Sequence, residues 1–486
     1  MMEQSPTRAG SASPGARGIA PLALLAIFMI LFLPVLLSGA EGTSEAYDAR
    51  EYHLPVIRRF VQQWPRLDLV NYESATAPGY HLFMASLLKL AGSETLLRAA
   101  NACFGVGLVL AIYLACRRAA ASPWTAAALA LPIACSPYTL GATIWLTTDN
   151  AAMLFVVLAL GGVLFGPYSS AKNLRLGLYA LLATGVRQIH VWLAAPVALV
   201  GLLAASLPAA FIKLLPRWVS EDPWLDRGCR GSWLHPIAGA ISAAMPVGVL
   251  IWFVSMWGGL MPKATGYVEL HNQGPNFAAP AFCLALVGTL GVFFLPFAWH
   301  RVAALIRKPA DLVAVACAAG ALLVALAPAT SHLWKPRSYG WLWKIVEKAP
   351  DLGERSLVIT ALAPVGALVL LLMHRAACDA GRRLPSLILL ASLLGWLLAQ
   401  TMNTMAWQRY FEPMVVVALA LMAAMTAHAP TRRPEQPMPA PRSEGRGIFA
   451  RAGAALGPVA LAGVYVLLNA VTTYREVLAD LGKPVQ

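Results

Sequence analysis

The sequence predicts an all-α polytopic membrane protein with about 13 transmembrane helices. Of its 486 residues, 58% are hydrophobic and only 12% are charged, whereas soluble domains carry about 25% charged residues. The apolar residues fall in long blocks, most of them close to the roughly 20 residues that a helix needs to cross a bilayer. Composition and block length together exclude an ordinary soluble protein.

The charge balance and the missing motifs exclude further classes of protein. Lys and Arg outnumber Asp and Glu by 37 to 23, a net charge of +14, which in a membrane protein is typical of basic cytoplasmic loops. No glycine-rich phosphate loop, dinucleotide-binding turn or basic stretch interleaved with aromatics is present in the sequence. The seven cysteines show neither C-x-x-C nor zinc-ligand spacing, and we interpret them as packing residues.

The first predicted helix, 19–37, follows a polar leader that carries Arg8 and Arg17. The sequence Ser38-Gly39-Ala40 after it is similar to a signal-peptidase site, so cleavage is the alternative. Because the apolar run is close to membrane-spanning length, we predict an uncleaved helix with the leader in the cytoplasm.

Loop charges set the rest of the predicted topology. With the leader inside, the basic clusters at 117–118, 301–308 and 375–383 all fall on the cytoplasmic side. We split 174–211 at Arg187 because one long tilted helix, the alternative, would reverse the side of every later loop. The further predicted spans are 96–116, 124–141, 149–166, 174–186, 189–211, 235–257, 279–299, 310–329, 356–373, 385–402, 410–427 and 452–470.

These spans give the following organisation. A cytoplasmic leader at 1–18 precedes a transmembrane module at 19–427, whose first outward loop covers 41–95. A cytoplasmic linker rich in Pro and Arg follows at 428–450. The final helix and a short outward tail occupy 451–486.

The first outward loop collects ionisable residues. Asp48, Glu51 and His53 lie within six residues, and such groups near a membrane are costly and indicate function. Pro55 then opens an amphipathic stretch, 56–64, that predicts a helix at the membrane interface. A solvated charge cluster beside an amphipathic helix is the alternative.

Other outward segments add candidate polar residues. Asp149 stands at a helix start, where capping is the simpler role. Arg187 lies in an apolar stretch, so it needs a partner, an aqueous cavity or an anionic ligand. Arg409 and Glu412, at another outer helix start, have the spacing of an intrahelical ion pair. The remaining candidates are Gln188, His190, His271, Asn272, Lys335 and Arg337, the last two beside tryptophans that would suit an interface belt.

The order of these motifs resembles the eukaryotic dolichyl-phosphate-glucose α-1,2-glucosyltransferase family, which belongs to the GT-C superfamily of multi-spanning glycosyltransferases. Arg50 stands where that family has an acid, and His190 where it has Asn. The Ala-rich, Arg-over-Lys composition is similar to that of bacterial proteins, so we extend the resemblance to the superfamily and not to the acceptor. The matching segments are 48–55, 76–79, 147–149, 186–192, 268–276 and 409–413.

The resemblance implies a GT-C-like fold and inverting transfer of a hexose from a polyprenyl-phosphate sugar to a lipid-linked or surface glycan acceptor. The reaction would take place on the outer face of a bacterial inner (plasma) membrane, with no nucleotide and no metal, although Asp48 and Glu51 could share one divalent ion. The resemblance implies that Asp48 is the general base, with Glu51 as the alternative and His53 as the orienting group. Arg187 and Arg409 would bind the donor phosphate, with Lys335 and Arg337 in reserve. The residues implied for the sugar or acceptor pocket are Asp149, Gln188, His190, His271 and Asn272.

Three other classes remain as alternatives. A ligase or flippase-like protein for lipid-linked glycans would use the same arginine-rich outer rim. A secondary transporter would place its polar residues near helix centres and in repeated halves, whereas here they cluster at one face without visible internal symmetry. A membrane scaffold would have no use for the acid-rich first loop.

Overall fold

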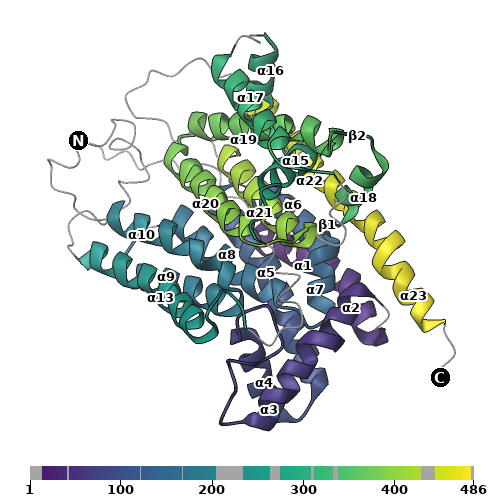
Figure 1. Cartoon of the computed structure of the whole chain (residues 1–486). Coiled ribbons are helices and arrows are strands. Elements are labelled where there is room, and N and C mark those ends of the chain that lie inside the picture. Colours follow the sequence, from purple (N-terminus) through teal and green to yellow (C-terminus); the bar gives the residue numbers. More distant parts are fainter. Residues whose placement is uncertain are drawn as a thin grey trace.

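The structure, a computed structural model, is almost entirely helical (Figure 1). It describes residues 14–40, 43–120, 122–166, 168–203, 234–262, 274–307, 311–331, 338–427 and 444–482. In these ranges the strands are two residues long: β1 (Ser338–Tyr339) pairs in parallel with β4 (Ala406–Trp407), and β2 (Asp351–Leu352) pairs antiparallel with β3 (Arg355–Ser356). The all-α prediction is confirmed.

Among the described residues, seven helices are long and apolar enough to cross a membrane, and the number rises to nine if each of two bent helix pairs forms one span. The chain is therefore a polytopic integral membrane protein. The long helices are α1 (Pro14–Ser38), α5 (Glu94–Ala119), α13 (Leu234–Trp257), α19 (Leu357–Asp379), α20 (Arg383–Thr401), α21 (Gln408–Thr426), and α22 (Glu444–Asn469), which continues through η5 (Ala470–Tyr474) into α23 (Arg475–Leu481).

The bent pairs and the shorter helices account for the remaining predicted spans. Helices α6 (Pro123–Cys135) and α7 (Pro137–Ile144) meet at 66°. Helix α15 (Ala279–Gly291) meets the segment formed by η3 (Leu295–Ala298) and α16 (Trp299–Arg307) at 81°. The shorter helices are α8 (Asp149–Leu164), α9 (Ser170–Val186), η2 (Gln188–Leu193) with α10 (Ala194–Leu203), and α17 (Leu312–Leu326).

In the described residues each of the 13 predicted spans falls on helix, and the predicted break at Arg187 is confirmed. This residue has an extended backbone, with φ −141° and ψ 111°, between α9 and η2. Three predicted spans, 149–166, 174–186 and 310–329, fall on helices of 15 to 17 residues, which are shorter than a full crossing. The predicted span 189–211 extends beyond the described residues, which end here at Leu203. The predicted linker 428–450 lies mostly outside the described residues, and α22 begins at Glu444, earlier than the predicted boundary at 451.

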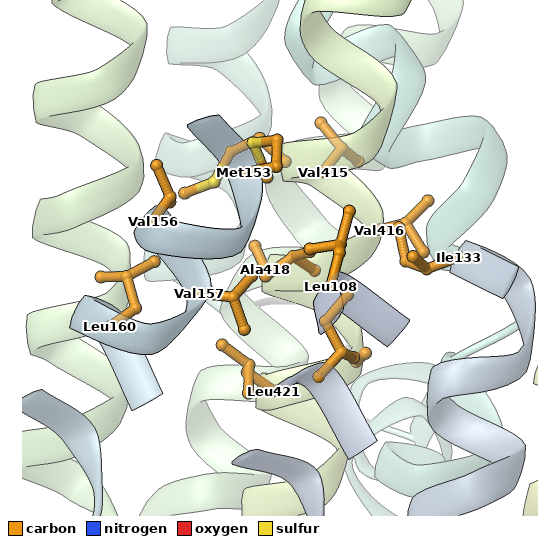
Figure 2. Packing of buried hydrophobic residues seen from close by; sticks show 14 of the residues in the cluster. Leu108, Ile133, Met153, Val156, Val157, Leu160, Val415, Val416, Ala418 and Leu421 are labelled. Atoms are coloured by element: carbon orange, nitrogen blue, oxygen red, sulfur yellow. The ribbon is translucent and has the colours of Figure 1, made fainter. Parts of the chain in front are cut away.

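Helix α21 forms the centre of the bundle. It packs against α5, α6, α8, α15 and α19, so that almost every side chain after its first turn is buried. Figure 2 shows this packing: Val415, Val416, Ala418 and Leu421 of α21 lie against Leu108, Ile133, Met153, Val156, Val157 and Leu160 of α5, α6 and α8. Because apolar contacts fix α21 so firmly, its polar first turn, which carries Arg409, is held in a defined place.

The first loop folds into a helical layer at one end of the bundle (Figure 1). It contains α2 (Ser44–Asp48), η1 (Ala49–His53), α3 (Leu54–Gln63) and α4 (Gly79–Ala91). The apolar residues Val56, Ile57 and Phe60 of α3 are buried inside the protein, and α3 packs on α4. The amphipathic helix thus joins the loop to the protein through its apolar face.

A second segment, which contains α18, packs at the start of α21. Helix α18 (Trp341–Lys348) follows β1, and the pairing of β1 with β4 ties it to the residues that precede α21. The Trp343 indole donates to the Ala406 carbonyl at 2.7 Å, and the Gln408 side chain accepts from the Leu342 amide at 2.9 Å. These contacts fix the backbone on which Arg409 stands.

Candidate functional site

Asp48 and Arg409 form an ion pair between the first loop and the central helix. Arg409 Nη1 donates to Asp48 Oδ2 at 2.5 Å, although the two residues are 361 positions apart. The guanidinium carbon lies 4.6 Å from the Trp407 ring centroid and 5.2 Å from that of Tyr410. Cation–π contact on both rings and the carboxylate together orient the arginine. Its side chain is 19% exposed and that of Asp48 is 22% exposed, so neither partner of the pair is fully buried.

The alternative pairing of Arg409 with Glu412 is wrong. Glu412 is fully buried and accepts from Trp341 Nε1 at 2.8 Å, Gln408 Nε2 at 2.6 Å and Ser136 Oγ at 3.3 Å. These neutral donors satisfy the carboxyl group on the side of α18 and α6, while the two aromatic rings hold Arg409 toward the first loop. The spacing of Arg409 and Glu412 along the helix permits an ion pair, but both side chains bind partners from other segments instead.

Asp149 and Arg187 form a second ion pair beside the first. Arg187 Nη1 donates to Asp149 Oδ1, and the side chains are 16% and 20% exposed. The capping role for Asp149 is therefore wrong: Thr148 is the N-cap residue of α8, and the Asp149 carboxylate is turned to Arg187. The Arg187 guanidinium also lies 4.7 Å from the Tyr410 ring centroid, so one ring contacts both arginines.

Both arginines line a cavity of about 410 Å³. Its lining is partly polar and partly apolar. The polar lining residues are Asp48, Tyr52, His53, Glu73, Ser74, Thr76, Arg187, Gln188, Asn403, Trp407, Arg409 and Tyr410. The apolar lining residues include Ile189, Val191, Leu250, Leu260, Met261, Ala399 and Met402. An amphipathic cavity of this size suits a ligand with a charged head and an apolar tail.

A smaller cavity of about 40 Å³ lies behind the first and shares Arg187, Ile189, Arg409 and Tyr410 with it. Four of its lining residues have a buried polar atom with no hydrogen-bond partner in the described part of the chain. These atoms are Thr147 Oγ1, His190 Nδ1, Gln400 Oε1 and Arg409 Nε. Such atoms are costly to leave unpaired, so this cavity suits a polar ligand or water that supplies the missing hydrogen bonds. Glu45 and Asp149 supply its carboxylates.

His53, which lines the larger cavity, and His81 form a pair of neutral imidazoles. His53 Nδ1 lies 3.0 Å from His81 Nε2. Burial lowers the pKa of His53 to about 4, and burial also lowers the pKa of His81 well below its ordinary value. Both rings are therefore uncharged at neutral pH, because a buried imidazolium would have to lose its hydration.

Gln188 links its own segment of the chain to two others through its side-chain amide. Its side-chain nitrogen donates to the carbonyls of Ala75 and Leu260, each at 2.8 Å, and its side-chain oxygen accepts from the Ala77 amide at 2.9 Å. All three partners are backbone groups. Gln188 therefore fixes the turn before α4 against the end of α13, at the wall of the larger cavity.

The structure brings most of the predicted site residues together. Asp48, His53, Asp149, Arg187, Gln188, His190 and Arg409 all line one or both cavities. Glu51 does not line either cavity, because its exposed carboxylate pairs with Arg50 at 2.7 Å. His271, Asn272, Lys335 and Arg337 lie outside the described residues.

Four residues of the site were not assigned a role from the sequence. Glu45 lies three positions before Asp48, and this spacing on one helix could have indicated the shared face. Tyr410 lies inside the 409–413 segment, but nothing in the sequence shows that its ring contacts two arginines. His81 and Glu73 carry no local signal, because only the folded loop brings them to the cavity or to His53.

The described residues contain no cluster of three or more His, Cys, Asp or Glu side chains that could hold a metal ion. Asp48 and Glu51, the pair considered for a shared ion, bind different arginines.

No protein-family model matches the chain, and no curated protein sequence matches it. Among solved structures, the chain is similar to the crystal structure of ArnT from Cupriavidus metallidurans in the apo state. The match has 15% sequence identity, covers 84% of this chain and 78% of that chain, and has a TM-score of 0.35. A likeness at this identity and TM-score assigns neither a family nor an activity to the chain.

Proposed function

We propose that this protein is a membrane-embedded inverting glycosyltransferase that moves a hexose from a polyprenyl-phosphate sugar to a lipid-linked or surface glycan acceptor. The observation that carries the proposal is the pair of arginines, Arg187 and Arg409, that share the Tyr410 ring on the wall of an amphipathic cavity. The proposed setting is the extracytoplasmic face of a bacterial inner membrane.

The arginine pair supports a phosphate ligand. A guanidinium offers several N–H donors in a plane and binds phosphate oxygens with two parallel hydrogen bonds. In this site the two guanidinium groups are already oriented by the Tyr410 ring and by one aspartate each. Buried Arg409 Nε, which has no partner in the described part of the chain, is a further donor for a ligand.

The apolar lining residues support a lipid carrier on that phosphate. Leu260 and Met402 are two of them, and they are 44% and 58% exposed. The lining of the cavity thus includes apolar side chains that the protein leaves uncovered. In the proposed complex a polyprenyl chain would leave past these side chains, while its phosphate stays on the arginines.

Asp48 is the residue best placed to act as the base. In the proposed reaction the acceptor oxygen attacks the anomeric carbon from the face opposite the phosphate, and its proton passes to the Asp48 carboxylate. The bond between the anomeric carbon and the phosphate oxygen breaks, and the electron pair leaves with the phosphate, which Arg187 and Arg409 stabilise. One displacement inverts the anomeric configuration.

The ion pair between Asp48 and Arg409 has a defined part in the proposed reaction. A bound phosphate competes with Asp48 for Arg409, because both are anions that bind the same guanidinium. Asp48 is then released from Arg409 beside the place where the acceptor arrives. Asp149 and His190, in the wall of the smaller cavity, are the proposed contacts for the sugar hydroxyls.

Transfer from radiolabelled polyprenyl-phosphate hexoses tests the proposal. Membranes with matched amounts of wild type, Asp48→Asn and Glu51→Gln are compared for label in lipid and polymer fractions. The Asn side chain still offers an oxygen to Arg409, so the donor should bind while transfer falls about 10²- to 10⁴-fold, the usual effect of a general base. Glu51→Gln, which changes an exposed carboxylate outside both cavities, should stay within about twofold of wild type.

Two results would contradict the proposal. If wild-type membranes use none of the polyprenyl-phosphate hexoses, the donor class is wrong. If Glu51→Gln abolishes transfer and Asp48→Asn does not, the donor class stands and the assignment of the base is wrong.

A further inference from the structure

His81 is a buried histidine that the proposed reaction does not use. It is the third residue of α4, and its side chain is fully inaccessible to solvent. Its ring is inclined by 23° to the ring of His53, with the two facing nitrogens 3.0 Å apart. His53, in contrast, lines the larger cavity beside Asp48.

The 3.0 Å contact between two neutral rings is a hydrogen bond only if a single proton lies between the facing nitrogens. Either His53 Nδ1–H donates to His81 Nε2, or His81 Nε2–H donates to His53 Nδ1. Each neutral imidazole has one donor and one acceptor nitrogen. The direction of this hydrogen bond therefore decides whether the free nitrogen of His53, Nε2, is an acceptor or a donor.

The surroundings of His81 favour one direction. His81 Nδ1 is buried and has no partner in the described part of the chain. The nearby hydroxyls do not provide one: Tyr72 donates to the Thr76 carbonyl, and Tyr80 donates to Asn101 Oδ1 at 2.9 Å. If His81 Nε2 accepted, Nδ1 would carry a buried hydrogen without an acceptor, and buried unpaired N–H groups are rarer than unpaired acceptors. The proton therefore belongs on His81 Nε2.

The surroundings of His53 favour the same direction. The charged groups that act on its ring are Asp48 and Asp149, and, with the opposite sign, Arg409 and Arg187. Asp48 is the strongest of the four and lines the same cavity. A nearby carboxylate stabilises an N–H group, and Nε2 is the nitrogen of His53 that is not in contact with His81, so a hydrogen on Nε2 is favoured.

We propose that His81 is a positioning residue that holds His53 as the tautomer protonated on Nε2, so that His53 donates a hydrogen bond into the larger cavity and Asp48 alone accepts the acceptor's proton. This inference rests on the proposed glycosyl transfer for its catalytic meaning, but the tautomer itself is independent of the reaction. His53 then contacts the acceptor oxygen or Asp48 as a donor and orients them.

The tautomer is measured by nitrogen NMR of the full chain in lipid nanodiscs, with histidine labelled by ¹⁵N. The chain has nine histidines, and the signals of His53 are identified by their loss in His53→Gln. The expected result at neutral pH is a protonated Nε2 and an unprotonated, hydrogen-bonded Nδ1 on His53. A protonated Nδ1 on His53 in the wild type would overturn the inference.

Variants of His81 test the positioning. His81→Phe keeps a ring but removes the hydrogen bond, so His53 should become a mixture of tautomers and kcat should fall about tenfold with little change in the KM for the donor. His81→Gln, whose amide still donates, should keep the wild-type tautomer and most of kcat. His235→Phe is the control, because His235 is also buried but binds Ser170 at 3.0 Å, away from this pair.

The outcomes separate this inference from the proposed function. An unchanged His53 spectrum in folded His81→Phe would refute the role of His81, whatever the activity. If transfer activity is absent in the wild type but the expected tautomer and its dependence on His81 are found, the positioning stands and the glycosyltransferase proposal falls. If His81→Phe fails to fold, His81→Gln and the wild-type tautomer still decide.

Discussion

Replacing Arg409 with lysine keeps the positive charge but removes the planar guanidinium. In the structure this group is in contact with the rings of Trp407 and Tyr410 while Nη1 donates to Asp48 at 2.5 Å. A lysine ammonium is a compact point charge without a fork of donors. It can therefore replace the charge of Arg409 but not the stacking and the paired hydrogen bonds together.

The size of the effect follows from the lost contacts. A hydrogen bond to a charged group contributes about 1.5–3 kcal/mol, and about 1.4 kcal/mol corresponds to a factor of ten in affinity. If lysine loses one such bond to the phosphate, the KM for the donor should rise about 10- to 100-fold. Because Arg409 is 19% exposed, water can replace part of the lost contact, which favours the lower half of that range.

The assay measures initial transfer rates over a range of donor concentrations with equal amounts of protein in the membranes. Arg58→Lys is the matched control, since Arg58 also binds a carboxylate through two donors, Nε at 2.9 Å and Nη2 at 2.6 Å from Glu94, but stands exposed and outside the cavity. It should stay within about twofold of wild type. A wild-type KM and kcat for Arg409→Lys would refute the reasoning, because charge alone would then be sufficient.

Two further variants probe the loop and its histidine. Gln188→Ala removes three hydrogen bonds to the backbone and should lower the free energy of unfolding by about 2–4 kcal/mol, seen as a lower midpoint of thermal unfolding; an unchanged midpoint would contradict its role. The pKa of His53 is lowered from 6.5 to about 4 in the folded protein, so the unfolded chain binds more protons than the folded one between pH 4 and 6.5. The free energy of unfolding should therefore fall by up to about 3 kcal/mol as the pH falls from 6.5 to 4. Thermal unfolding across this pH range should show a smaller fall in His53→Gln.

Much of the fold could be predicted because apolar block length is a direct signal of helix in a membrane protein. The break at Arg187 was predictable as well, since the alternation of loop charges favours it over one long helix. The bends between α6 and α7 and between α15 and η3 were not, because a bend inside one apolar block leaves its hydropathy unchanged. Pro137 at the start of α7 is a local signal for the first bend, but its angle depends on the packing around it.

The site was predictable as a set of residues and not as a set of contacts. Asp48, Arg187 and Arg409 could be chosen because charged groups beside apolar blocks are costly without a function. Their pairing could not, because the sequence offers Glu412 as the near partner of Arg409, and only the fold brings Asp48 there. The same holds for Tyr410, whose contact with both arginines exists only after the fold has brought Arg187 to the start of α21.

The two ion pairs also lead to an order of binding. Asp48 and Asp149 each neutralise one arginine in the structure, so a phosphate that binds both guanidinium groups must compete with an aspartate. In the proposed reaction Asp48 is the one to move, since it lines only the larger cavity, by which the proposed donor would arrive, whereas Asp149 lines the smaller one. The base would thus be free only when the donor is bound.

This coupling predicts that the donor binds first and that the acceptor binds productively only afterwards. Initial rates measured over a grid of donor and acceptor concentrations, with the released polyprenyl phosphate as product inhibitor, should show competition between this product and the donor but not between it and the acceptor. Asp48→Asn, whose neutral amide competes less with a phosphate, should bind the donor at least as tightly as wild type while transfer is lost. Weaker donor binding in Asp48→Asn, or acceptor binding that is equally tight without donor, would show that Asp48 holds the site together and does not control its order of use.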